Sequence, residues 1–222
     1  TIHGQRATLG YHSGHGEPSY VSIVNQGTIA VDREGGVFTL AGASLQNTGT
    51  GKLQANAGGK LMLQVSTLTS AGPLSASVNS TVEFYGDLQN ANNELRLRGG
   101  GTWNLFGSMV GGTVRCEEGA VLTMSNARLT NITLVGALIG NSGVLDKVKL
   151  QGTLDMSRRD GARLTVRNGL TLDGTATLGN AANNWWAGLD FTDGDQTLGG
   201  TGEVLFASNR SENVLRVTKE AS

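Results

Sequence analysis

The sequence predicts an all-β chain folded as a single-stranded, right-handed parallel β-helix, a solenoid of stacked coils. Three observations lead to this fold class. Short runs in which apolar residues alternate with Thr, Lys or Asn recur along the chain, and no long helical pattern interrupts them. Most runs end at a Gly or Asn corner, a residue type that adopts positive φ at low cost. Similar phrases return at roughly 20–25 residues, a period that suits one coil and gives about nine or ten coils in all.

The strands follow one another closely from residue 20 onward, and most open just after a glycine. Gly59 to Leu63, Gly101 to Leu105 and Gly152 to Met156 are examples of this phrase. The expected strands are 20–24, 28–31, 37–41, 52–55, 60–64, 81–85, 94–98, 102–105, 113–116, 121–124, 132–135, 144–150, 153–156, 163–166, 170–172, 175–178, 187–191, 203–206 and 213–217. In each strand the alternating apolar residues should point into one continuous core.

An antiparallel β-sandwich is the alternative that short strands of this kind leave open. Many of the corners, however, are single Gly or Asn residues, which bend a coil but do not reverse a strand into a hairpin. Asparagines also recur at coil spacing, at Asn25, Asn47 and Asn90, and we expect them to stack in ladders that lie either inward or at the corners. These features favour the parallel β-helix.

Composition limits the possible classes of function. The 34 glycines and 2 prolines among 222 residues exclude collagen, and a net charge of −1 gives no basis for binding nucleic acid. Charged residues make up 16% of the chain, so Thr, Ser, Asn and Gln must furnish the surface, as in many extracellular β proteins. Cys116 is the single cysteine and is expected to be a small buried hydrophobe. No apolar run is long enough to span a membrane.

We expect two parts: an irregular N-terminal strand and loop segment over residues 1–18, and one elongated β-helix over residues 19–222. Residues 1–4 and 7–11 are predicted as two short strands, followed by a polar loop. Neither terminus shows the polar or helical cap that protects the end of an isolated solenoid. The expected partners are therefore further copies of the chain in a head-to-tail polymer, or tandem neighbours.

Two segments are candidates for a metal site. His12 and His15 lie close together in the N-terminal loop with a nearby carboxylate, a set that can bind zinc or nickel. Asp190, Asp193 and Asp195 surround Gly194, an arrangement that can wrap calcium but that lacks the length and final acidic residue of an EF-hand loop. We expect an ordinary Asp-Gly turn there and no cofactor, with calcium as the ion to consider.

No catalytic residues are expected, although some parallel β-helices cleave polysaccharides. Such chemistry needs clustered carboxylates on one exposed face. Asp146, Asp155 and Asp173 are the candidates for such a row, but each is the polar alternate of its own strand. Trp103 alternates with Leu105 and is expected in the core, whereas the pair Trp185 and Trp186 is expected in a loop, with sugar stacking as the alternative.

Several sequence segments resemble those of a known class of proteins. Residues 25–29 (Asn-Gln-Gly-Thr-Ile), 45–50, 58–63, 168–179 and 195–202 resemble β-helical repeat segments of large secreted bacterial proteins. These are similar to autotransporter passengers and filamentous-haemagglutinin-like adhesins. The resemblance covers roughly residues 19–217 and implies a non-catalytic structural segment of an extracellular or cell-surface fibre or adhesin. A polysaccharide-binding or polysaccharide-degrading β-helix is the alternative, with a polysaccharide or a cell-surface molecule as ligand.

Overall fold

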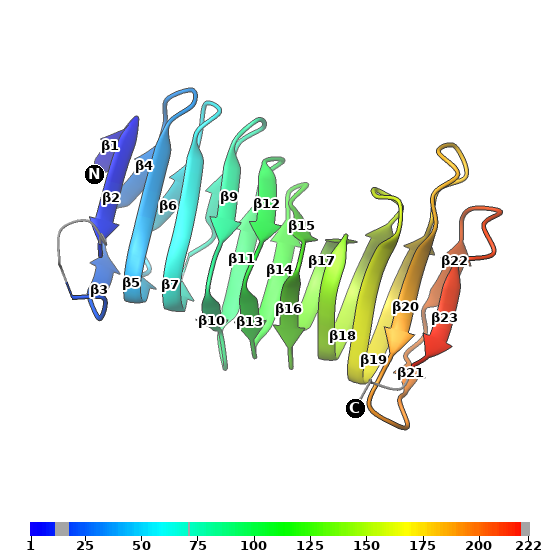
Figure 1. The fold of residues 1–222 in the computed structure, drawn as a ribbon. Coiled ribbons are helices and arrows are strands. Elements are labelled where there is room, and N and C mark those ends of the chain that lie inside the picture. The colour runs from blue at the N-terminus through cyan, green and yellow to red at the C-terminus, as the bar shows by residue number, and fades with distance from the viewer. Residues whose placement is uncertain (12–17, 71, 219–222) are drawn as a thin grey trace.

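The computed structural model describes residues 1–11, 18–70 and 72–218. Over these residues the chain forms a β-solenoid of about nine turns, with no helix. Figure 1 shows the strands stacked in one row, from β1 at the N-terminal end to β23 at the C-terminal end. All pairings between named strands are parallel, and an isolated antiparallel bridge joins Asn180 to Trp185. The prediction of a parallel β-helix is confirmed and the antiparallel sandwich is excluded, while the handedness of the coil stays a prediction.

Each turn passes through three faces, which we call the first, second and third face in chain order. The first face contains β1 (Ile2–Gly4), β4 (Thr28–Val31), β6 (Lys52–Ala55), β8 (Leu74–Ala76), β11 (Glu94–Arg98), β14 (Thr113–Glu117), parts of β17 (Thr133–Gly140), β18 (Ser142–Met156) and β19 (Ala162–Leu178), and β21 (Leu198–Gly199). The second face contains β2 (Arg6–Gly10), parts of β5 (Val37–Asn47) and β7 (Lys60–Ser70), β9 (Thr81–Phe84), β12 (Thr102–Leu105), β15 (Val121–Met124), parts of β17, β18 and β19, and β22 (Glu203–Phe206). The third face contains β3 (Ser22–Asn25), parts of β5 and β7, β10 (Asp87–Gln89), β13 (Ser108–Val110), β16 (Ala127–Thr130), parts of β18 and β19, β20 (Ala187–Phe191) and β23 (Val214–Val217).

The first turn already includes the N-terminal strands. β1 pairs with β4, and β2 pairs with β5 over five residues, Arg6 to Gly10. The two strands expected in this region are therefore present. The strand pairing does not set them apart from the solenoid, because they stack on the same faces as the strands that follow them.

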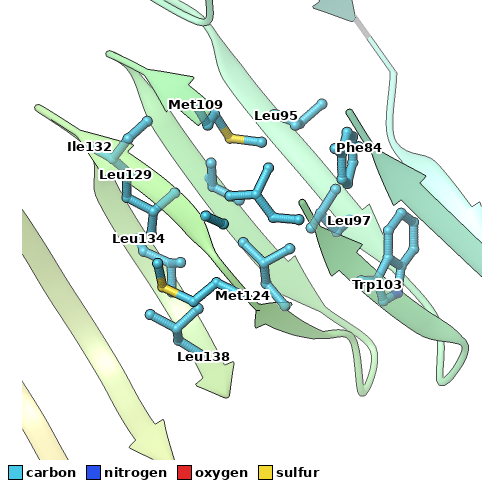
Figure 2. Packing of buried hydrophobic residues seen from close by; sticks show 14 of the residues in the cluster. Phe84, Leu95, Leu97, Trp103, Met109, Met124, Leu129, Ile132, Leu134 and Leu138 are labelled. Atoms are coloured by element: carbon cyan, nitrogen blue, oxygen red, sulfur yellow. The ribbon is translucent and has the colours of Figure 1, made fainter. Parts of the chain in front are cut away.

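The core is one continuous column of buried side chains inside the stack. On the second face, the inward residues Phe38, Leu61, Val82 and Trp103 lie directly above one another in successive coils and are almost fully buried. Figure 2 shows the same stacking in the middle of the solenoid, where Met124, Leu134 and Leu138 lie in the same cluster as Trp103 and Phe84. Full burial of one such side chain contributes about 1.5–3 kcal/mol, so repetition of the coil provides most of the stability.

Turn length varies more than the sequence predicted. One turn takes as few as 16 residues, from Asn126 to Ser142, and as many as 31, from Arg6 to Val37. Strand lengths vary less than this, and the segments between the strands absorb most of the difference. A single period of 20–25 residues is therefore wrong for this chain, although the number of turns is close to the expected one.

A column of stacked glycines at one corner explains the recurrent sequence pattern in which Gly precedes a strand. Gly136, Gly152 and Gly174 lie in register where the first face turns into the second. A β-carbon on Gly152 would lie 2.0 Å from the carbonyl oxygen of Gly136, and one on Gly174 would lie 1.9 Å from that of Gly152. Gly152 also has a φ of 147°, a conformation that favours glycine. Close backbone stacking at this corner therefore requires glycine.

Candidate functional site

The histidine candidates His12 and His15 lie outside the described residues. The structure places the other metal candidates at the end of β20 and in the loop that follows. The carboxylate of Asp190 accepts two hydrogen bonds from Arg216, with Nε–Oδ1 and Nη2–Oδ2 distances of 2.7 and 3.0 Å, and Asp193 pairs with Arg167 at 3.1 Å.

Asp195 is exposed in the same loop. Within residues 1–11, 18–70 and 72–218, no group of three or more His, Cys, Asp and Glu side chains is arranged to hold a metal ion. The structure thus places Asp190 and Asp193 beside arginines, and in the part of the chain that it describes it brings together no ligand set for the calcium ion considered there.

The row of aspartates considered for catalysis does not form. Asp146 lies on the third face opposite Arg167, Asp155 on the second opposite Thr177, and Asp173 on the first opposite Gln151. Their spacing in sequence does not match the turns that contain them, so each one falls on a different face. The structure therefore excludes the alternative in which these three carboxylates align on adjacent coils.

Ion pairs between coils run along the third face. Arg128 and Asp146 form a short charge-assisted hydrogen bond, and Asn168 donates to the other oxygen of Asp146 at 2.7 Å. Further along this face, Asp190 lies between Arg163 at 3.5 Å and Arg216 at 2.7 Å. Asp146 and Asp190 are both almost fully buried by these neighbours. The pairs join one coil to the next, which is the way opposite charges stabilise adjacent strands.

A second network lies on the first face, between β11 and β14. Glu117 accepts hydrogen bonds from both Arg98, at 2.6 Å, and Arg96, at 3.0 Å, and these bonds lower the pKa of the Glu117 carboxyl below its usual value. Arg115 pairs with Glu94 at 3.1 Å in the opposite direction across the same two strands. Arg96 and Arg98 alternate along β11 and so lie on the same side of it, where they share Glu117 as a partner.

One buried carboxylate on the second face was not anticipated. Glu83 is 5% exposed. Its carboxylate forms an ion pair with Lys60 Nζ at 3.0 Å and accepts a hydrogen bond from the hydroxyl of Tyr85 at 2.9 Å. Partial burial and the hydrogen bond to Glu83 raise the pKa of Tyr85. The sequence signal was the alternation itself, which predicts that Glu83 points outward but not that its neighbours cover it.

The remaining sequence candidates fall near their expected places. Trp103 is fully buried, with its indole Nε1 donating to the carbonyl oxygen of Gly99 at 3.2 Å. Trp185 and Trp186 follow a turn rather than forming part of a strand, and Arg163 lies 5.1 Å from the centre of a Trp186 ring. Cys116 is half-buried against the core, and desolvation raises the pKa of its thiol to about 11.

An open groove lies at the corner between the third and first faces. Its volume is about 390 Å³, and amide, ammonium and hydroxyl groups from four successive coils line it. Asn131, Lys147 and Asn168 occupy this corner with positive φ values of 53°, 55° and 51°. Such groups can hydrogen-bond a polyhydroxylated ligand.

The C-terminal coil exposes a set of apolar side chains that would be interior elsewhere in the stack. Phe206 is 47% exposed, although Leu178, in the same inward column one coil earlier, is fully buried. Val217 is 75% exposed, although Phe191, in the same inward column one coil earlier, is buried. Leu198 and Leu215 are 40% and 37% exposed for the same reason. Among the described residues, no strand pairs with the outer edge of β21, β22 or β23.

The N-terminal coil is open in the corresponding way. Ile2 is 45% exposed, and Ala7, Leu9 and Ile23 are only partly buried, whereas Ile29 and Leu40 in the next coil are covered. β1, β2 and β3 each have described pairing partners on one side alone. Both ends of the described solenoid therefore present three parallel strand edges and a cross-section of the core.

The fold and its surfaces define the class of protein as a β-solenoid with an irregular repeat. Comparison with family models, with curated proteins and with solved structures finds no significant match. No helix among the described residues is long and apolar enough to cross a membrane.

Proposed function

We propose that this chain is a non-catalytic structural segment of an extracellular or cell-surface fibre or adhesin of bacterial type. Its role is to stack end to end, either with identical units or with tandem neighbours that continue the coils. The observation that supports the proposal most is the exposed core of the C-terminal coil. Phe206 and Val217 occupy inward positions, yet among the described residues no next coil covers them.

Stacking of a further coil has a clear physical advantage here. An open strand edge and a half-exposed Phe or Leu are costly in water, and full burial of such a side chain contributes about 1.5–3 kcal/mol. Each internal coil of this solenoid gains that energy from its neighbour. A coil added at β21, β22 and β23 would gain it in the same way.

The long faces also fit a structural role. Several of their carboxylates are engaged by arginine or lysine from an adjacent coil, as Glu117 is by Arg96 and Asp190 is by Arg216. A carboxylate held in this way joins one coil to the next, as opposite charges on adjacent strands do. An extracellular location is supported by the low charged fraction of 16%, with Thr, Ser, Asn and Gln furnishing much of the surface.

The proposal is tested by the mass of the assembled species as a function of concentration, measured by light scattering. The wild type should grow in mass on concentration, and negative-stain images should show particles that lengthen without thickening. Phe206→Lys should hold the protein near its monomer mass, because a charge at the open end cannot be buried.

Phe106→Lys is the matched control, since Phe106 is similarly exposed, at 40%, but lies at a corner in mid-solenoid. It should assemble as the wild type does. A wild type that stays monomeric at every concentration would contradict the proposed end-to-end role.

Polysaccharide binding is the second candidate function, and the groove beside Asn131, Lys147 and Asn168 favours it. Three successive coils place similar polar groups at one corner, so a linear sugar chain could lie along the solenoid axis. Isothermal titration with an anionic polysaccharide tests it. Binding that Lys147→Ala weakens would support this function, and absence of binding heat would contradict it.

A further inference from the structure

The second face sets the alignment of whatever coil follows β22. Its ten strands keep one unbroken register from β2 to β22, without a bulge on this face. The inward column runs Ala7, Phe38, Leu61, Val82, Trp103, Leu122, Leu138, Leu154, Ala176 and Val204. The outward column beside it begins at Arg6 and ends at Glu203. Any coil that continues this face in register would therefore place its Arg6 equivalent next to Glu203.

We infer that the coil that covers the C-terminal end is the first coil of a second copy of this chain, with its β2 paired in parallel to β22 and its Arg6 beside Glu203. The inference rests on the proposed end-to-end function and names the partner and the register. In this register the second copy's Ala7 lies over Val204, and its Leu9 lies over Phe206.

The two edges are complementary in charge. Arg6 and Glu203 are both exposed, and within the described residues neither takes part in an ion pair. The one described hydrogen bond of the Glu203 carboxylate comes from the Thr175 hydroxyl, at 3.1 Å. Strands in a sheet lie about 4.8 Å apart, so the guanidinium of the second copy's Arg6 can reach this carboxylate.

The two edges are also complementary in shape and direction. At the N-terminal end the chain passes through β1, β2 and β3, and at the C-terminal end through β21, β22 and β23, in the same order of faces. A shift along the solenoid axis, with the twist of the stack, therefore brings all three pairs of edges together. Because this contact joins two different surfaces, it does not close on itself, and it predicts an open filament.

Charge reversal tests the register. Arg6→Glu and Glu203→Arg should each raise the protein concentration needed for half-maximal assembly by roughly tenfold, since each puts like charges side by side. The double variant Arg6→Glu/Glu203→Arg should restore assembly to near the wild-type level. Lys52→Glu is the matched control, because Lys52 is exposed in mid-solenoid and its reversal changes the net charge as Arg6→Glu does. Circular dichroism of each variant verifies the fold.

A pair of engineered cysteines gives a second, independent readout. Thr8 and Leu205 are the ends of the neighbouring outward column, so Thr8→Cys in one molecule and Leu205→Cys in another should cross-link under oxidation in a Cys116→Ala background. Neither variant should form that cross-link with Thr123→Cys in mid-solenoid.

The outcomes separate this inference from the function on which it rests. Assembly that is weakened by each reversal and rescued by the double variant supports the register. If the charge reversals leave assembly unchanged, or if the double variant does not restore it, the register is overturned while end-to-end stacking stands. A wild type that never assembles overturns both.

Discussion

The side-chain amide of Asn25 donates a hydrogen bond to the side-chain oxygen of Asn47, 2.7 Å away and one coil further along. Both side chains are buried, at 6% and 1% exposed. Asn47 in turn donates to the hydroxyl of Ser70 at 3.0 Å and to the carbonyl oxygen of Gly51 at 3.1 Å. This ladder satisfies polar corner groups that the stacked coils remove from water.

The ladder predicts a large cost for loss of its central member. Asn47→Leu should destabilise the protein by about 1–3 kcal/mol, because Asn25 and Ser70 lose a buried partner. Urea denaturation measures the free energy of unfolding. Asn183→Ala, on an exposed turn, is the control and should change it by less than about 0.5 kcal/mol. Equal stability of the two variants would show that the ladder contributes nothing.

The glycine column predicts an intolerant position. Gly152→Ala should lower the free energy of unfolding by more than about 2 kcal/mol, because the new methyl group meets the carbonyl oxygen of Gly136 and the backbone φ is strained. Gly49→Ala serves as the comparison, since no atom lies within 4 Å of the position that its new methyl group would take. Thermal unfolding of the two variants should differ clearly, and similar melting temperatures would contradict the close stacking of this corner.

The hydrogen bonds of Glu117 predict that the stability of the folded protein depends on pH. Its hydrogen bonds from Arg98 and Arg96 lower its pKa in the folded state below the ordinary value of 4.5. The stabilising contribution is therefore present above pH 4.5 and is lost as the pH falls through the folded-state pKa. The difference in urea midpoint between the wild type and Glu117→Gln should shrink over that acid range. A constant difference for Glu117→Gln over this range would refute the linkage.

Cys116 predicts low thiol reactivity. Burial raises the pKa of its thiol to about 11, so little thiolate exists at neutral pH. Disulfide exchange with an aromatic disulfide reagent should run roughly a hundredfold slower in the folded protein than in urea. The absorbance of the released thiolate measures both rates. Similar rates in the two conditions would show that the thiol is exposed in solution.

The architecture was predictable because the alternation of inward and outward residues survives in almost every coil. The strand around Trp103 was expected at its observed bounds, and the ranges expected around Leu61 and Leu154 lie within the longer strands β7 and β18, since Gly precedes each range. The expected stacking of Asn25 on Asn47 is also confirmed. Asn90 instead donates to the carbonyl oxygens of Gly111 and Thr113 in the next coil.

The strands of the third face were harder to find. β10 and β13 contain three residues each, with one inward side chain apiece, Leu88 and Met109. One apolar residue shows no periodicity, so these strands cannot be told from a loop. The ion pairs were also out of reach, because the partners of Asp146 and Asp190 depend on turn lengths that vary from coil to coil.

Amide hydrogen exchange as a function of protein concentration tests the central claim most directly. If a second copy adds β2 to β22, amides of both edge strands should exchange more slowly as the concentration rises. Those of β12, in the middle of the stack, should not change. Exchange in β2 and β22 that is the same at every concentration would contradict end-to-end stacking, because the open edges would then have no partner in another copy of the chain.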